Sequence, residues 1–195
     1  MYLKNTIQSL FWGIITAGMS LIFQLVIISL AISSRYSAET DKILLGSVLF
    51  LAIYSLSEES FKYFIVTKKI INLSYGKTFL LNSWIAGIGF SLVESFIIYQ
   101  KNISEKIDFS LIDVFSTAPL HILTFGTLGY FLAISEKQGL NIKILLFNFI
   151  IHLIYNYSII YLESYSHLIT GLLITILLII NIYGFLIVNK KLASD

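Results

Sequence analysis

The chain has 195 residues, of which 57% are hydrophobic and 12% are charged, and its formal net charge at pH 7 is +2. Soluble domains typically have about twice that charged fraction, so the composition indicates a single integral membrane domain over residues 1–195. The small net charge gives no reason to expect a nucleic-acid partner. The lack of cysteine excludes disulfides, thiolate nucleophiles and thiolate metal sites.

Apolar segments long enough to cross a lipid bilayer recur along the chain. A spanning helix needs about 20 mainly apolar residues. The sequence predicts an all-α, polytopic bundle of about six transmembrane helices, over residues 8–33, 43–66, 78–99, 112–134, 143–161 and 167–189. The apolar run of the first segment, Ile7 to Ser33, is longer than the roughly 7–15 residues of a signal peptide. We therefore expect it to be retained as a span.

Basic residues between these spans divide unequally between the two sides of the membrane. One side would have Lys4, Lys68, Lys69, Lys77, Lys137, Lys143, Lys190 and Lys191. The other would have Arg35, Lys42, Lys101 and Lys106. Because cytoplasmic loops carry the excess of lysine and arginine, we expect a multi-pass protein with both termini in the cytoplasm.

The second predicted span contains two glutamates and a lysine, Glu58, Glu59 and Lys62. A charged side chain at the centre of a spanning helix costs roughly 2.5–3.5 kcal/mol, so these three should face protein, water or one another. Their spacing lets both acids reach the lysine. The simpler alternative is that they snorkel to the interface. Glu58 would lie about 12 Å inside Val66 at helical rise, which is far for a short side chain.

The third predicted span combines a stripe of small residues with one acid. Ser83, Gly87, Ser91 and Ser95 recur every four residues, which lets another helix approach closely. Glu94 lies beside this stripe. It could simply mark the outer end of the helix, but apolar residues follow it, which favours a position inside the membrane.

The fourth and fifth spans contribute histidines. His121 follows Pro119, which removes a backbone hydrogen bond and suits a local opening. His152 and Asn156 are four residues apart and therefore share one helix face. Structural hydrogen bonding between helices is the alternative for each. Gln24 and Asn181 are interpreted only as interhelical hydrogen-bonding residues.

Alternating helix directions place the acids, the histidines and the amide at similar depths. Four helices would thus deliver Glu58, Glu94, His121, His152 and Asn156 to one layer of the membrane interior. Such a set can orient and deprotonate water and can donate hydrogen bonds to the oxyanion of an attacked carbonyl. It could instead hold a metal ion with an open coordination position, or relay protons in a transporter.

These residues, in this order, resemble the motifs of PrsW-type intramembrane proteases. Glu58-Glu59-Ser60-Phe61-Lys62 resembles their EExxK motif, and Gly89-Phe90 followed by Glu94 resembles the second motif. Pro119-Leu120-His121 with Gly126 resembles the third motif, and His152 with Asn156 the fourth. This group forms one superfamily with type II CAAX prenyl endopeptidases and bacteriocin-immunity membrane proteins. The resemblance covers about residues 45–160.

The resemblance implies a role for each residue. Glu58 would activate water, and Glu59, Lys62 and Phe90 would shape the site. Glu94 and His121 would help to hold the water or a metal ion. His152 and Asn156 would stabilise the oxyanion. No cofactor is favoured, although Glu58, Glu94, His121 and His152 would be the ligands of a divalent metal such as zinc. Ser95 departs from the asparagine that often follows the glutamate of the second motif.

The sequence therefore predicts an intramembrane endopeptidase of a bacterial plasma membrane that cuts a peptide bond with a glutamate-activated water. The substrates implied are membrane proteins, such as single-span anti-sigma factors, or peptides. One alternative is a non-catalytic immunity or binding protein on the same scaffold. Another is a proton-coupled transporter, which typically has repeats or broken helices at matching positions; the sequence has neither.

Overall fold

The computed structural model describes residues 2–33, 47–74, 78–106, 111–134 and 142–194 of the chain. These residues form helices and short turns, without a strand among them, and the predicted all-α class is confirmed. The elements in chain order are α1 (Tyr2–Ser33), α3 (Val48–Ile65), the π-helix η1 (Val66–Ile70), α4 (Ile71–Leu73), α5 (Thr78–Glu105), α6 (Leu111–Val114), α7 (Ala118–Ile134), α8 (Ile142–Tyr161), the 3₁₀-helix η2 (Glu163–Tyr165) and α9 (Ser166–Ser194).

The bundle is that of a helical membrane protein. Four helices are long and apolar enough to cross a membrane by length and composition, over Leu3–Ala31, Thr78–Glu105, Ile142–Tyr161 and Ser166–Val188. Helix α7 is equally apolar in character but has 17 residues. Helix α3 contains Glu58, Glu59 and Lys62, and its run of helix continues through η1 and α4.

Several helices extend beyond the predicted spans or start later. Helix α1 begins at Tyr2 rather than at residue 8, and α9 continues to Ser194 rather than ending at residue 189. Three further differences have a clear physical reason. The second span was expected to end near residue 66, but the helix continues to Leu73, so Lys68 and Lys69 lie on helix rather than in a loop. Helix α5 likewise continues to Glu105, because lysine and glutamate are good helix formers even where an apolar pattern stops. The fourth span starts at Ala118 rather than 112, because proline is tolerated only in the first turn of a helix and Pro119 lies there.

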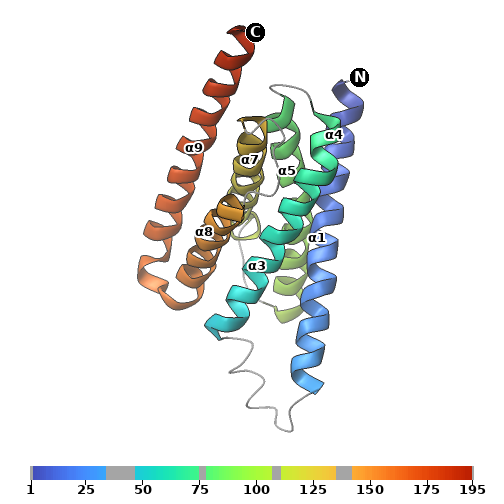
Figure 1. Cartoon of the computed structure of the whole chain (residues 1–195). Helices are drawn as coiled ribbons and strands as arrows, with labels where there is room; N and C mark the ends of the chain where they lie inside the picture. The colour runs from blue at the N-terminus through green and yellow to red at the C-terminus, as the bar shows by residue number, and fades with distance from the viewer. Residues whose placement is uncertain (1, 34–46, 75–77, 107–110, 135–141, 195) are drawn as a thin grey trace.

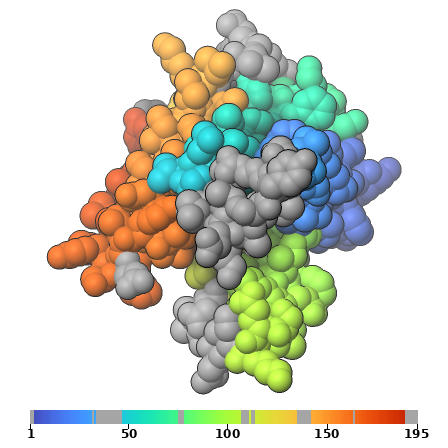
Figure 2. All heavy atoms as spheres, turned by 90° about the horizontal axis from the view of Figure 1, so that it is seen from below, coloured from blue at the N-terminus to red at the C-terminus, as the bar shows by residue number. Residues whose placement is uncertain are grey.

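The long helices run in alternating directions along the chain, and the two ends of the chain lie at the same end of the bundle (Figure 1). Helix α5 packs chiefly against α7 and α1, and α3 packs against α8 and α1. Figure 2 views the opposite end, where the end of α5 and the turn between α8 and α9 lie on different sides of α3. Four of the predicted basic loop residues, Arg35, Lys42, Lys77 and Lys137, lie outside the described part of the chain.

The stripe of small residues on α5 allows the close helix approach that the sequence predicts. A Cβ atom added to Gly87 would lie 2.6 Å from Cα of Ile122 on α7, so only glycine fits there. Ser91 Oγ donates to the carbonyl oxygens of Gly87 and, across to α7, of Ala118. The close packing of α5 on α7 brings Glu94 beside His121.

Polar and apolar side chains are distributed as expected for a lipid-exposed bundle. Large apolar side chains are exposed on the outer faces, for example Ile22, Leu49, Phe96 and Ile179. The interior combines buried apolar side chains with fully buried charged and polar ones, and Lys62 is the largest fully buried side chain. Because ionisable groups inside a membrane are costly, their concentration at one place marks that place as a candidate site.

Candidate active site

The interior charges come from four helices and form one connected cluster. Helix α3 supplies Glu58, Glu59 and Lys62, and the other members are Glu94 of α5, His121 of α7 and His152 of α8. The side chains of Glu59, Lys62, His121 and His152 are between 0% and 2% exposed, whereas those of Glu58 and Glu94 are 15% and 28% exposed. The two partly open carboxylates are therefore the members that can meet water or a substrate.

Lys62 is the centre of this cluster. Its Nζ lies 2.6 Å from Glu59 Oε1, 2.8 Å from His121 Nδ1 and 3.1 Å from Thr124 Oγ1. It also lies over the ring of Phe90, 4.9 Å from the ring centroid. An ammonium group has three donors and no acceptor, so these three polar partners use all of its hydrogen bonds. The snorkelling alternative is excluded for Lys62, which is fully buried and directed inward.

The lysine determines where His121 carries its proton. Because Lys62 donates to Nδ1, that nitrogen is an acceptor, and the proton of the neutral imidazole is on Nε2. Nε2 in turn is in contact with Oε2 of Glu94. The same carboxylate oxygen accepts a hydrogen bond of 2.8 Å from Thr117 Oγ1. The Nε2 side of His121 therefore lies against the Glu94 carboxylate and restricts its position.

His152 has the opposite arrangement. Its Nδ1 lies 2.8 Å from Glu59 Oε1, and a carboxylate can only accept, so the proton of the neutral ring is on Nδ1. Its Nε2 then has a lone pair and lies 3.6 Å from Glu58 Oε2. Glu59 Oε1 thus accepts from both Lys62 and His152 and links the two halves of the cluster. This pattern of an acid orienting a histidine is common to many catalytic sites.

The open carboxylates of Glu58 and Glu94 line the same cavity. It has a volume of about 190 Å³ and lies between α1, α3 and α5; its other lining residues are Ala17, Ser20, Leu21, Gln24, Phe90, Ile97 and Ile98. Glu58 Oε1 accepts a hydrogen bond of 2.9 Å from Gln24 Nε2. Glu58 Oε2 is buried and has no hydrogen-bond partner among the described residues. A cavity of this size with polar atoms in its wall can hold several water molecules.

Asn156 is the one predicted site residue that lies outside the connected cluster. Its Nδ2 donates to Ser55 Oγ on α3 at 3.2 Å, one helical turn before Glu58. The side chain is half-buried and lies one turn from His152 on the same helix. Its amide is therefore near the Glu58 half of the cluster, on the face of α8 that packs on α3. The other predicted residues, including Phe90, do converge, and their chemical roles stay predictions.

Several residues of the site were missed or underestimated by sequence reasoning. Gln24 was interpreted as a structural hydrogen bond, and it does bond between helices, but its partner is Glu58. The others are Ser55, Thr117, Thr124, Asn148 and Tyr155. Asn148 lies four residues before His152, so the same spacing rule that paired His152 with Asn156 could have found it. Tyr155 donates to the Ser116 carbonyl oxygen at the turn before α7, a contact that no sequence pattern indicated.

Three of the predicted metal ligands offer atoms that lie within 4.8 Å of one another: Glu58, His121 and His152. Glu94 is not part of that group. A histidine that binds a metal normally donates its other N–H to a carboxylate or carbonyl, as His152 does. His121 does not fit, because one ring nitrogen faces the Lys62 ammonium and the other faces Glu94. These three residues could hold a metal ion if His121 gave up its contact with Lys62 or with Glu94.

Comparison of the chain with protein-family models, with curated proteins and with solved structures finds no match.

Proposed function

We propose that the protein is an intramembrane endopeptidase in which Glu58 activates a water molecule. One observation carries the proposal: Glu58 lines a cavity of about 190 Å³ together with Glu94, and its Oε2, which has no hydrogen-bond partner among the described residues, lies 3.6 Å from Nε2 of His152. A carboxylate with these neighbours is suited to take a proton from water. The resemblance to PrsW-type proteases supports the same chemistry from the sequence.

In the proposed reaction, water enters the cavity between Glu58 and Glu94 and gives one proton to Glu58 Oε2. The resulting hydroxide attacks the carbonyl carbon of the scissile peptide bond, and the carbonyl oxygen becomes an oxyanion. The proton on Glu58 can be shared with Nε2 of His152, whose Nδ1–H donates to Glu59. The C–N bond then breaks, and the proton passes to the leaving amine.

The remaining residues would hold this geometry and stabilise charge. His152, on sharing the proton, would become a donor toward the oxyanion, and Asn156 Nδ2 would be the second donor after leaving Ser55. His121 would keep Glu94 directed at the cavity. Lys62 would hold Glu59 ionised, so that Glu59 can stabilise positive charge on His152. No step needs a metal ion.

A proton-coupled transporter is less well supported by the same contacts. Glu94, His121, Lys62, Glu59, His152 and Glu58 form a continuous series of ionisable groups. Both ends of the series, Glu58 and Glu94, line one cavity. A relay across a membrane needs its two ends on opposite sides, and this series returns to the side from which it starts.

The decisive experiment compares wild type with Glu58→Gln. A library of tagged single-span membrane proteins is co-expressed with each, and any protein that is cut is then cleaved with purified enzyme in detergent. Glutamine keeps the volume but accepts no proton, so we expect a loss of at least roughly 10²–10⁴ in rate. The matched control is Glu105→Gln, an exposed acid at the end of α5. Equal cleavage by Glu58→Gln would remove Glu58 from the mechanism and favour the binding-protein alternative.

A chelator arm of the same experiment tests the absence of a metal. Cleavage should continue in the presence of a chelator, because His121 has no lone pair free for a metal ion. Loss of activity on chelation, with recovery on adding zinc, would show that Lys62 gives up its contact with His121 and that the metal version of the mechanism holds.

We further propose that the membrane is a bacterial plasma membrane and that both termini are cytoplasmic. The unequal distribution of lysine supports this orientation. Reporter fusions after residues 72 and 191 should both report the cytoplasm. Reports from the other side at both positions would reverse the orientation, and opposite reports from the two would contradict the six-helix topology.

A further inference from the structure

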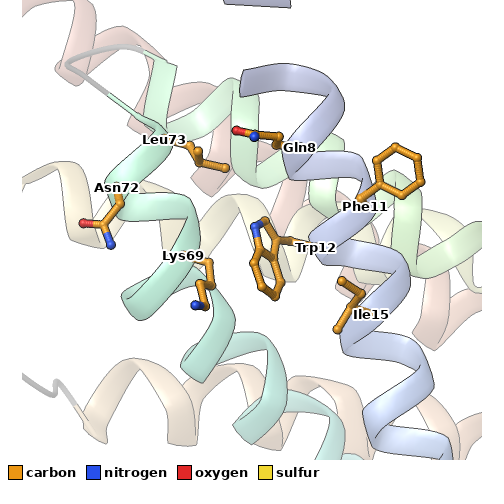
Figure 3. A pocket seen from close by; sticks show the side chains of 7 residues that line it. All are labelled: Gln8, Phe11, Trp12, Ile15, Lys69, Asn72 and Leu73. Atoms are coloured by element: carbon orange, nitrogen blue, oxygen red, sulfur yellow. The ribbon is translucent and has the colours of Figure 1, made fainter. Parts of the chain in front are cut away.

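A second hollow lies on the outer surface, between α1 and the segment formed by η1 and α4 (Figure 3). Its volume is about 440 Å³, and its lining residues are Gln8, Phe11, Trp12, Ile15, Lys69, Asn72 and Leu73. Figure 3 shows the side chains of Lys69 and Trp12 in the space between the two helices. None of these residues belongs to the cluster around Lys62, so the hollow is a separate feature of the molecule.

The chemistry of the hollow changes along α1. Gln8 lies at one end, Trp12 in the middle and Ile15 at the other end. A helix of 32 residues is about 48 Å long, whereas the hydrocarbon of a bilayer is about 30 Å thick. If α1 is centred in the membrane, Gln8 is near the edge of the hydrocarbon and Ile15 is inside it. The hollow therefore runs from the headgroup region into the acyl-chain region.

A cation is held at the polar part of this hollow. Lys69 Nζ lies over the ring of Trp12, 4.9 Å from its centroid. Lys69 itself is exposed, in contrast to the buried Lys62 one heptad earlier. Tryptophan and lysine together are characteristic of the membrane–water interface, where the ring is at headgroup level and the ammonium faces lipid phosphate.

Hydrogen bonds between the helices hold the walls of the hollow in place. Asn5 Nδ2 on α1 donates to the Leu73 carbonyl oxygen at 2.8 Å. Asn82 Nδ2 on α5 donates to the same oxygen at 3.2 Å and to Ser74 Oγ at 2.8 Å. These bonds fix the end of α4 against its neighbours, so the two walls keep their spacing.

The described residues at this end of the bundle carry a net positive charge. Lys4, Lys68, Lys69 and Lys143 are exposed there. The described residues at this end, 2–8, 68–74, 78–80, 131–134, 142–145 and 188–194, include no aspartate or glutamate. Such a surface attracts anionic lipid headgroups, each lysine contributing separately.

We propose that this hollow is a binding site for an anionic phospholipid. Its headgroup would lie at the outer end of the hollow beside the amides of Gln8 and Asn72, the ammonium of Lys69 would meet the phosphate from the inner side, and an acyl chain would follow Phe11 and Ile15. Phe11 and Ile15 are 57% and 43% exposed, so this apolar wall is available to a chain. The site is independent of the proposed peptidase reaction and does not require it.

The test measures lipid binding to the full-length protein in detergent. A fluorescent phosphatidylglycerol is titrated, and unlabelled phosphatidylglycerol, phosphatidylcholine and inorganic phosphate are used as competitors. We expect phosphatidylglycerol to compete best and phosphatidylcholine, whose headgroup has no net charge, about fivefold less well, which is the effect of one lysine near an anionic lipid headgroup. Inorganic phosphate at similar concentration should not compete. Equal competition by both lipids, or competition by phosphate alone, would overturn the proposal.

Lys68 supplies a matched control, because it is the exposed neighbour of Lys69 and does not line the hollow. Lys69→Gln should weaken phosphatidylglycerol binding about fivefold and remove the preference over phosphatidylcholine. Lys68→Gln should leave the preference in place. Equal losses in the two variants would mean that diffuse surface charge, not a site, attracts the lipid. Trp12→Phe, which keeps an aromatic ring but weakens the cation–π contact, should reduce affinity in a folded protein even if Lys69→Gln is unstable.

Discussion

The two buried histidines are chemically opposite although their surroundings are nearly the same. His121 has a lysine at Nδ1 and a glutamate at Nε2, whereas His152 has glutamates at both nitrogens. Their rings are 5.2 Å apart and packed edge to face. A donor at Nδ1 makes the first histidine donate at Nε2, and an acceptor at Nδ1 leaves the second with a lone pair there. One buried lysine thus divides the cluster into two halves. The half around His121 positions Glu94, and the half around His152 can take up a proton.

Observation of the two histidine tautomers tests this division of roles most directly. In protein labelled with ¹⁵N-histidine, the spectrum should show His121 as the Nε2–H form and His152 as the Nδ1–H form. The remaining histidine, His167, is exposed and serves as an internal reference, assigned with His167→Gln. Two identical tautomers for His121 and His152 would contradict the division of roles.

Removal of Lys62 should have the largest energetic effect. Lys62→Met leaves Glu59 as a buried carboxylate without its main counter-charge, which typically destabilises a protein by about 3–5 kcal/mol. Thermal unfolding in detergent measures this loss. His121 should also lose its fixed tautomer, because Nδ1 no longer faces a donor.

A double variant distinguishes the effect of losing the counter-charge of Glu59 from the effect of changing how the side chain at position 62 packs. Lys62→Met with Glu59→Gln removes both charges together, and much of the lost stability should return because no carboxylate is left unpaired. Peptidase activity should stay low, because a glutamine at position 59 can still accept a hydrogen bond from His152 but no longer supplies the negative charge that stabilises a protonated His152. A double variant no more stable than Lys62→Met alone would show that the lysine contributes through packing.

A smaller effect is expected at the edge of the cluster. If Asn156 donates to the oxyanion, Asn156→Ala should reduce kcat by roughly 10²–10³ with little change in KM. Ser55→Ala removes only the hydrogen-bond partner of Asn156 in the free protein and should leave kcat within about tenfold. Equal losses in kcat for the two variants would identify the contact between Asn156 and Ser55 as structural.

The sequence was sufficient to locate the cluster, for a simple physical reason. In an apolar helix an ionisable residue is expensive, so Glu58, Glu94, His121 and His152 stand out from the residues around them. Helical spacing and alternating helix direction then place them at similar depths. The structure adds that Glu58 and His152 are in contact distance, with 3.6 Å between Oε2 and Nε2.

The finer features could not be read from the sequence. Which nitrogen of a histidine meets which partner depends on side-chain rotation and on helix separation of a few tenths of an ångström, and spacing along the chain contains neither. Neutral polar residues such as Gln24 and Thr117 cost little free energy in a membrane-spanning helix, so they do not stand out in the sequence. The start of α7 depended on how Pro119 is accommodated in its first turn, which an apolar pattern does not indicate.

The π-helix η1 changes which residues of the continuous helix from α3 to α4 face the protein interior. Residues seven apart share a face of a regular α-helix to within about 20°, so Lys69 would face the same way as Lys62 in an unbroken one. The buried row here instead runs through Lys62, Val66, Ile70 and Ser74, in steps of four, and Lys69 is exposed. The wider turn of η1 accommodates this slower winding. One helix thereby presents Lys62 to the protein interior and Lys69, seven residues later, to the surface beside α1.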